Sequence, residues 1–67
     1  MMNNREIGVV LRKRRKALGV DQRTLSEISG VAVHTLSNIE AGKGNSTVST
    51  LNRVLTALGM ELRIEVK

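Results

Sequence analysis

The stretch LGVDQRTLSEISGVAVHTLSNIEAGKG, residues 18–44, contains the strongest structural pattern in this chain. Asp21 is a residue type that caps helix N-termini, and Gly30 is the type that ends helices in the left-handed conformation. A short helix is therefore predicted over residues 22–29. The apolar residues expected on its buried face are Leu25 and Ile28.

A second short helix is predicted over residues 33–41, where Leu36 and Ile39 are spaced to face one core. Only residues 30–32 separate it from the first helix. Two short helices joined by so tight a glycine-containing turn form a helix-turn-helix. The second helix then keeps one apolar face on the domain and is free to project a polar face outward.

Two further helices are predicted on either side of this unit. The first covers residues 4–18, between the N-cap candidates Asn3 and Asn4 and the helix-ending Gly19. The other covers residues 48–58 and stops before Gly59. Apolar residues recur at helical spacing in both. The residues expected on the buried stripes are Ile7, Val10, Leu11, Leu18, Val48, Leu51, Val54, Leu55 and Leu58.

The end of the chain changes to a period of two, which predicts a half-buried strand over residues 60–66. Its inward residues would be Met60, Leu62, Ile64 and Val66. The chain offers no second convincing strand, so the unpaired backbone groups are expected to pair with the same tail of a second copy. The sequence thus predicts a homodimer joined by an antiparallel ribbon.

The composition narrows the class of partner. The chain has 67 residues, a formal net charge of +5 and no aromatic residue. A chain this short forms one domain, residues 1–67. Its basic balance favours a polyanion partner, although the basic run at residues 12–16 points all the way round a helix and is equally typical of a solvated face. The lack of aromatics argues against the base stacking that single-strand and RNA binders use.

The sequence lacks the residue sets of enzymes and metalloproteins. His34 is the sole histidine, cysteine is absent and the six acidic residues are scattered, so no metal site, cofactor or enzyme activity is expected. The run Val9 to Leu11 is too short for a membrane span, and the N-terminus has no signal-peptide core. We expect a cytoplasmic, nucleoid-associated protein without a membrane partner.

Residues 18–44 resemble the Cro/cI-type, or Xre-like, helix-turn-helix family. The features that match are Gln22, Leu25, Gly30, Thr35-Leu36, Ile39-Glu40 and Gly42. The C-terminal half, with its predicted strand, resembles the HipB-type antitoxins of that family. The resemblance implies a mainly all-α fold, a four-helix lambda-repressor-like domain with a short C-terminal β-strand that forms an intersubunit ribbon.

The resemblance also implies roles for individual residues, which without it would be taken as solvated. The positions placed toward base edges are Val33, His34, Ser37 and Asn38, and those placed toward phosphates are Gln22, Arg23, Thr35 and Lys43. Arg15 and Glu40 match a pair that ties the first helix to the third. Asn can pair with adenine, Ser can donate or accept a hydrogen bond, and Val can touch a thymine methyl group.

The function expected from these features is sequence-specific binding of double-stranded DNA by a homodimeric transcriptional regulator, a repressor acting on a palindromic operator. An alternative remains open. In this alternative the protein is an antitoxin whose main role is to hold a HipA-like toxin inactive, and DNA binding is a secondary role. The two functions use different surfaces, because the first needs the polar face of the helix at residues 33–41 and the second needs the opposite side of the domain.

Overall fold

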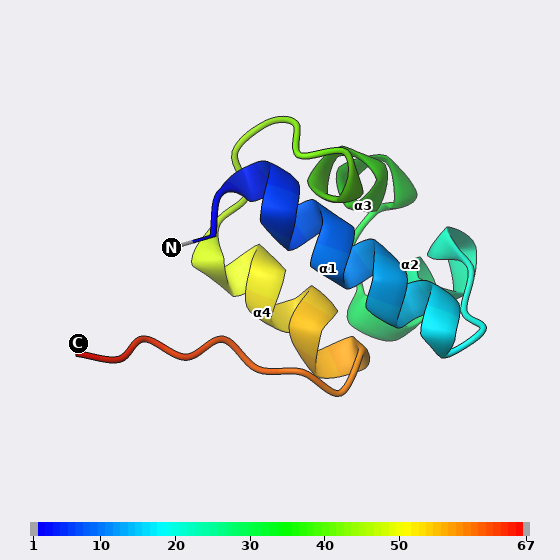
Figure 1. Ribbon diagram of the computed structural model, residues 1–67. Coiled ribbons are helices and arrows are strands. Elements are labelled where there is room, and N and C mark those ends of the chain that lie inside the picture. The colour runs from blue at the N-terminus through cyan, green and yellow to red at the C-terminus, as the bar shows by residue number, and fades with distance from the viewer. Residues whose placement is uncertain (1, 67) are drawn as a thin grey trace.

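A computed structural model describes residues 2–66 of the chain. It contains four helices in this part of the chain, shown in Figure 1: α1 (Asn4–Ala17), α2 (Gln22–Ser29), α3 (Val33–Glu40) and α4 (Val48–Ala57). All four helices were predicted. The predicted bounds of α2 agree with the structure, and the other three helices each end one residue earlier than expected.

Side-chain caps start three of the helices. Asn3 Oδ1 accepts a hydrogen bond from the Glu6 backbone N–H at 2.9 Å, and Asp21 Oδ1 accepts one from that of Thr24 at 2.7 Å. Thr47 caps α4 in the same way. Ala32, at the start of α3, makes no side-chain cap, so α3 lacks a stabilising contact that is worth about 1 kcal/mol.

The core lies where the four helices meet. Its buried apolar residues are Leu11, Leu25, Val31, Leu36, Ile39, Val54, Leu55 and Leu58. Contacts join α1 to α3, and α2 to both α3 and α4. Figure 1 shows α1 running across the domain, with α3 on one side and α4 on the other. Helices α2 and α3 therefore form the predicted helix-turn-helix, held together by Leu25, Leu36 and Ile39.

Four residues predicted to lie on the buried stripes of the helices are exposed instead. Ile28 is 61% exposed and Val48 is 59% exposed, and Val10 on α1 and Leu18, directly after α1, are also exposed. Val10 and Ile28 lie at the side of their apolar stripes, whereas Leu18 and Val48 lie at the ends of theirs, and in both places the stripe extends beyond the surface that neighbouring helices cover. Ile28 and Val48 face a hollow between α2 and α4.

The predicted strand at residues 60–66 is absent from the single chain, where this segment has no regular structure. Met60 packs against the core, whereas Leu62, Ile64 and Val66 are 44%, 92% and 100% exposed. Figure 1 shows this tail, in orange and red, running beside the helices without a neighbouring extended segment. A strand requires a partner for its backbone N–H and C=O groups, and one chain supplies none.

Candidate nucleic-acid interface

The two faces of α3 differ as the sequence predicts. Leu36 and Ile39 are 1% and 6% exposed and fix the helix to the core. The four residues predicted to read bases lie on the remainder of its circumference: Val33, His34 and Ser37 are exposed and Asn38 is half-buried. The structure therefore places a continuous strip of polar and small apolar side chains on the outside of α3.

Two of these side chains touch each other. His34 Nε2 and Asn38 Nδ2 are 3.4 Å apart, one helical turn from each other on α3. The Asn38 amide donates in this contact when the imidazole nitrogen is unprotonated. The contact links the orientation of the Asn38 amide to that of the His34 ring.

Gly8 determines how closely α1 approaches α3. A Cβ atom at this position would collide with the Ile39 carbonyl oxygen and would lie 2.6 Å from that of Glu40. Gly42, after the end of α3, has a φ of +72°, and a Cβ there would lie 2.8 Å from the Arg5 Cα. The end of α3 and its exit loop are thus pressed against the backbone of α1, which limits how α3 can tilt.

Arg15 and Glu40, which were predicted to pair, form a bidentate ion pair between α1 and α3. Arg15 Nε donates to Glu40 Oε2 at 2.7 Å, and Arg15 Nη2 donates to Glu40 Oε1 at 2.8 Å. Arg15 Nη1 also donates to the Val20 carbonyl at 2.9 Å. The two side chains are 11% and 7% exposed, so this pair is well shielded from water.

The ion pair changes the acidity of both partners. Burial acts to raise the pKa of Glu40, but hydrogen bonds from Arg15 and Gln22 and the positive charges of Arg15 and Arg12 hold that pKa below its ordinary value. The hydrogen bond to Glu40 raises the pKa of Arg15 above its ordinary value, although burial opposes it. Both groups are therefore charged at neutral pH, where the ion pair links the two helices.

A cleft above this ion pair gathers residues from α1, α2 and α3. Arg12, Gln22 and Ser37 line it together with Arg15, Glu40 and Ala41, around a volume of 270 Å³. A guanidinium, an amide and a hydroxyl all can donate hydrogen bonds to an anion. The predicted phosphate contact Gln22 and the predicted base contact Ser37 are thus neighbours.

The other residues predicted to contact phosphates lie outside this cleft. Arg23 follows Gln22 at the start of α2 and is exposed. Thr35 is half-buried on α3. Lys43 is exposed in the loop after α3, where it borders a separate small hollow with Asn4 and Gly42. The predicted phosphate contacts are therefore spread around α3 rather than gathered at one point.

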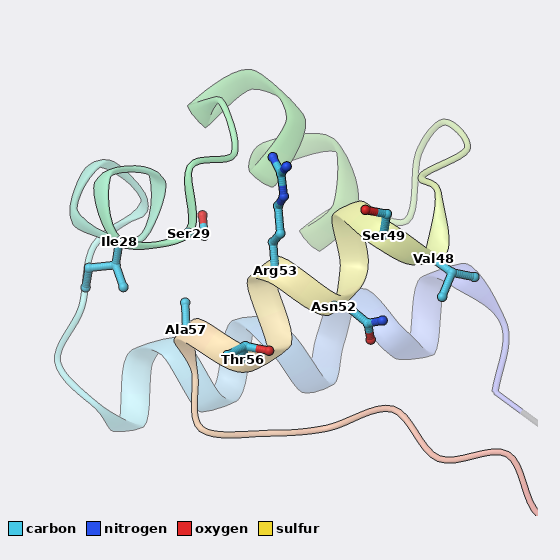
Figure 2. A pocket seen from close by; sticks show the side chains of 8 residues that line it. All are labelled: Ile28, Ser29, Val48, Ser49, Asn52, Arg53, Thr56 and Ala57. Atoms are coloured by element: carbon cyan, nitrogen blue, oxygen red, sulfur yellow. The ribbon is translucent and has the colours of Figure 1, made fainter.

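A larger hollow, of 870 Å³, lies between α2 and α4. Figure 2 shows Ile28 lining it from α2 and Val48, Asn52 and Arg53 lining it from α4. None of the residues predicted to contact DNA is part of this lining. The groove between α2 and α4 is therefore separate from the α3 strip and its cleft.

Two other kinds of site are absent from residues 2–66. No three His, Cys, Asp or Glu side chains there lie close enough together to hold a metal ion. None of the helices in that range has the length and apolarity needed to cross a membrane.

The fold and this arrangement of helices are those of a known family. The family model described as helix-turn-helix matches residues 11–64, so the chain belongs to that family. No curated protein matches the chain significantly.

Two solved structures are similar to it over most of its length. The restriction-modification controller protein C.AhdI from Aeromonas hydrophila is 31% identical, with a TM-score of 0.82, over 87% of this chain and 88% of that one. The clp gene regulator ClgR from C. glutamicum is 32% identical, with a TM-score of 0.83, over 92% of this chain and 80% of that one.

Two residues that shape the site were not singled out from the sequence. Arg12 was seen only as part of a basic run, and the cleft identifies it as the member next to Gln22 and Ser37. Gly8 could have been recognised from the sequence, because a glycine inside a helix is unfavourable and often indicates that a neighbouring backbone packs closely there. Its spacing from Leu11 and Arg15 places it on the buried face of α1, where such a neighbour would lie.

Proposed function

We propose that this protein is a sequence-specific regulator of transcription that binds double-stranded DNA through α3. The observation that carries the proposal is the pair of faces on α3. Leu36 and Ile39 anchor the helix, and the exposed strip presents Val33, His34 and Ser37 beside the Arg12–Gln22 cleft. Membership of the helix-turn-helix family and the likeness to two regulators, C.AhdI and ClgR, support it.

The proposed division of labour assigns base reading to the strip and positioning to the cations and amides around it. Asn38, with Ser37, would discriminate between base pairs, at about 1–3 kcal/mol for each good contact. Gln22, Arg23, Thr35 and Lys43 would hold phosphates, which fixes the register of α3 in the groove without reading sequence.

A binding series with alanine variants tests this function. Ser37→Ala and Asn38→Ala are expected to relax preference at particular base pairs, whereas Lys43→Ala is expected to weaken all sequences alike and to reduce the salt dependence of binding. The readout is a selection of preferred duplexes from a randomised pool, followed by affinities measured across salt concentrations. Equal, sequence-blind decreases in affinity for all three variants would remove Ser37 and Asn38 from the reading set.

We further propose that the regulator acts as a homodimer and represses from a palindromic operator. The exposed side chains of Leu62, Ile64 and Val66 support this, because they have no burial within one chain. Pairing of two tails would satisfy their backbone groups and cover these side chains. A two-fold dimer would present two α3 helices to successive major grooves, about 34 Å apart. Analytical ultracentrifugation of the chain with and without residues 60–67 tests this assembly.

The second candidate function is an antitoxin that holds a HipA-like toxin inactive. The groove between α2 and α4 favours a protein partner, since the exposed Ile28 and Val48 lie at a surface separate from α3. Co-purification with the product of a neighbouring gene, abolished by Ile28→Asp and retained by Ser37→Ala, would support it. If no partner is captured, the antitoxin role is rejected and the role of a DNA-binding regulator remains.

A further inference from the structure

We propose that α1 supplies a second set of contacts to DNA phosphates, through a basic row made of Arg5, Arg12 and Lys16. The inference rests on the proposed function and extends it, because none of these three residues belongs to the helix-turn-helix itself. It assigns a purpose to part of the charge of +5, which the contacts predicted for α2 and α3 leave unexplained.

The geometry of α1 places the three cations along one flank. Gly8 marks the direction of α3, because it touches the backbone of that helix. With about 100° of rotation per residue, Arg12 lies about 40°, Arg5 about 60° and Lys16 about 80° from Gly8 around the helix axis. Lys16 follows Arg5 by eleven residues, so the row is about 16 Å long.

Two observations place the row beside the proposed DNA surface. Arg12 lines the cleft that also contains Gln22 and Ser37, and its charge contributes to the low pKa of Glu40 at the end of α3. The Arg5 backbone packs against Gly42, the residue before Lys43 in the exit loop. The row therefore follows the side of α1 that borders α3 and its exit loop.

The three side chains are available for a partner. All three residues are exposed. Within residues 2–66, the ion pairs involve Arg15 and Arg63 and none of the members of the row. Arg15, by contrast, lies next to the row in sequence but is buried and committed to Glu40. The row thus consists of the cations on this flank that are not used to hold the fold together.

The same helix contains a matched control. Lys13 is adjacent to Arg12 in sequence and is also exposed. It lies about 140° from Gly8 around the helix axis, turned away from α3. Replacing Lys13 by Gln removes the same charge from the same helix as replacing a member of the row, but from the flank that does not border the cleft.

The experiment compares Arg5→Gln, Arg12→Gln and Lys16→Gln with Lys13→Gln. Binding to a mixed-sequence DNA duplex is measured by fluorescence anisotropy between about 50 and 200 mM NaCl, and the slope of log K against log salt is compared. Each substitution that removes a phosphate-binding cation from the row is expected to make this slope shallower by about 0.9, and Lys13→Gln is expected to leave it unchanged. Thermal unfolding of each variant establishes that the fold is intact.

The outcomes distinguish a failure of the α1 contacts from a failure of the proposed DNA-binding function. The inference would be overturned if the row variants and Lys13→Gln gave the same slope, whether all became shallower or none did. The position of the cation on α1 would then not matter. Shallower slopes for the row variants alone would establish the contacts between α1 and DNA phosphates. If the unaltered protein shows no salt-dependent affinity for duplex DNA, the proposed function fails before the row is tested.

Discussion

The helix-turn-helix and the C-terminal tail both place apolar residues at regular spacing, yet only the first buries them. Leu36 on α3 is 1% exposed, whereas Leu62 in the tail is 44% exposed and Ile64 is 92% exposed. A helix pairs its own backbone groups and needs only a surface to pack on. A strand needs both a surface and a partner. Within one chain the tail, unlike α3, therefore leaves most of its apolar side chains exposed.

The contrast between the two regions is tested most strongly by making the same change in both. Leu36→Ala is expected to lower the free energy of unfolding by about 3 kcal/mol, because it removes a fully buried side chain and leaves a cavity. Leu62→Ala is expected to cost less than about 1 kcal/mol, since much of this side chain is already in water. Urea unfolding monitored by circular dichroism measures both. Similar decreases for the two variants would mean that the tail is as firmly packed as α3.

Gly8→Ala tests whether α3 is held as closely as the structure indicates. The added methyl group would meet the carbonyl oxygens of Ile39 and Glu40, so α1 and α3 would have to separate. The clash outweighs the gain in helix propensity, and a net decrease of about 2 kcal/mol in stability is expected. Val9→Ala, on the exposed side of the same helix, is the control and is expected to change stability by less than about 0.5 kcal/mol. A stabilised Gly8→Ala protein would contradict the close contact.

The ion pair between α1 and α3 predicts a dependence on pH. Because the folded pKa of Glu40 lies below its ordinary value of 4.5, its stabilising contribution is complete above that pH and is lost as the pH falls through the folded pKa. Glu40→Gln is expected to cost about 1–2 kcal/mol at pH 7, where it removes charged hydrogen bonds.

The measurement is the difference in unfolding free energy between the unaltered protein and Glu40→Gln from neutral to acidic pH. That difference is expected to shrink below pH 4.5, as Glu40 becomes protonated in the unaltered protein. A constant difference across this range would show that the carboxylate charge does not link the helices.

The smallest effect on the folded monomer is expected from Ile64→Ser in the tail. This side chain is 92% exposed, so the stability of the monomer is expected to change by less than about 0.5 kcal/mol. The dissociation constant of the proposed homodimer is instead expected to rise, as sedimentation velocity over a concentration series would measure. Unchanged self-association would exclude Ile64 from the dimer interface.

The helices and their order could be predicted from the sequence alone. Asn3, Asp21 and Gly30 act through hydrogen bonds and backbone conformations that extend over only a few residues, so their effects are local. The core anchors Leu36 and Ile39 were also predictable, because they lie at the centre of their apolar stripe. The candidate base-reading residues followed from the same periodicity together with the family resemblance.

The surfaces that meet in the folded domain could not be predicted in this way. Ile28 and Val48 continue the apolar stripes of their helices but lie beyond the area that neighbouring helices cover, and no local pattern reveals that limit. The contact of Gly8 with α3 and the position of Arg12 beside Gln22 likewise depend on how helices distant in sequence are packed. Local hydrogen bonding sets the elements, whereas burial depends on the area that packed elements share, which is a property of the whole domain.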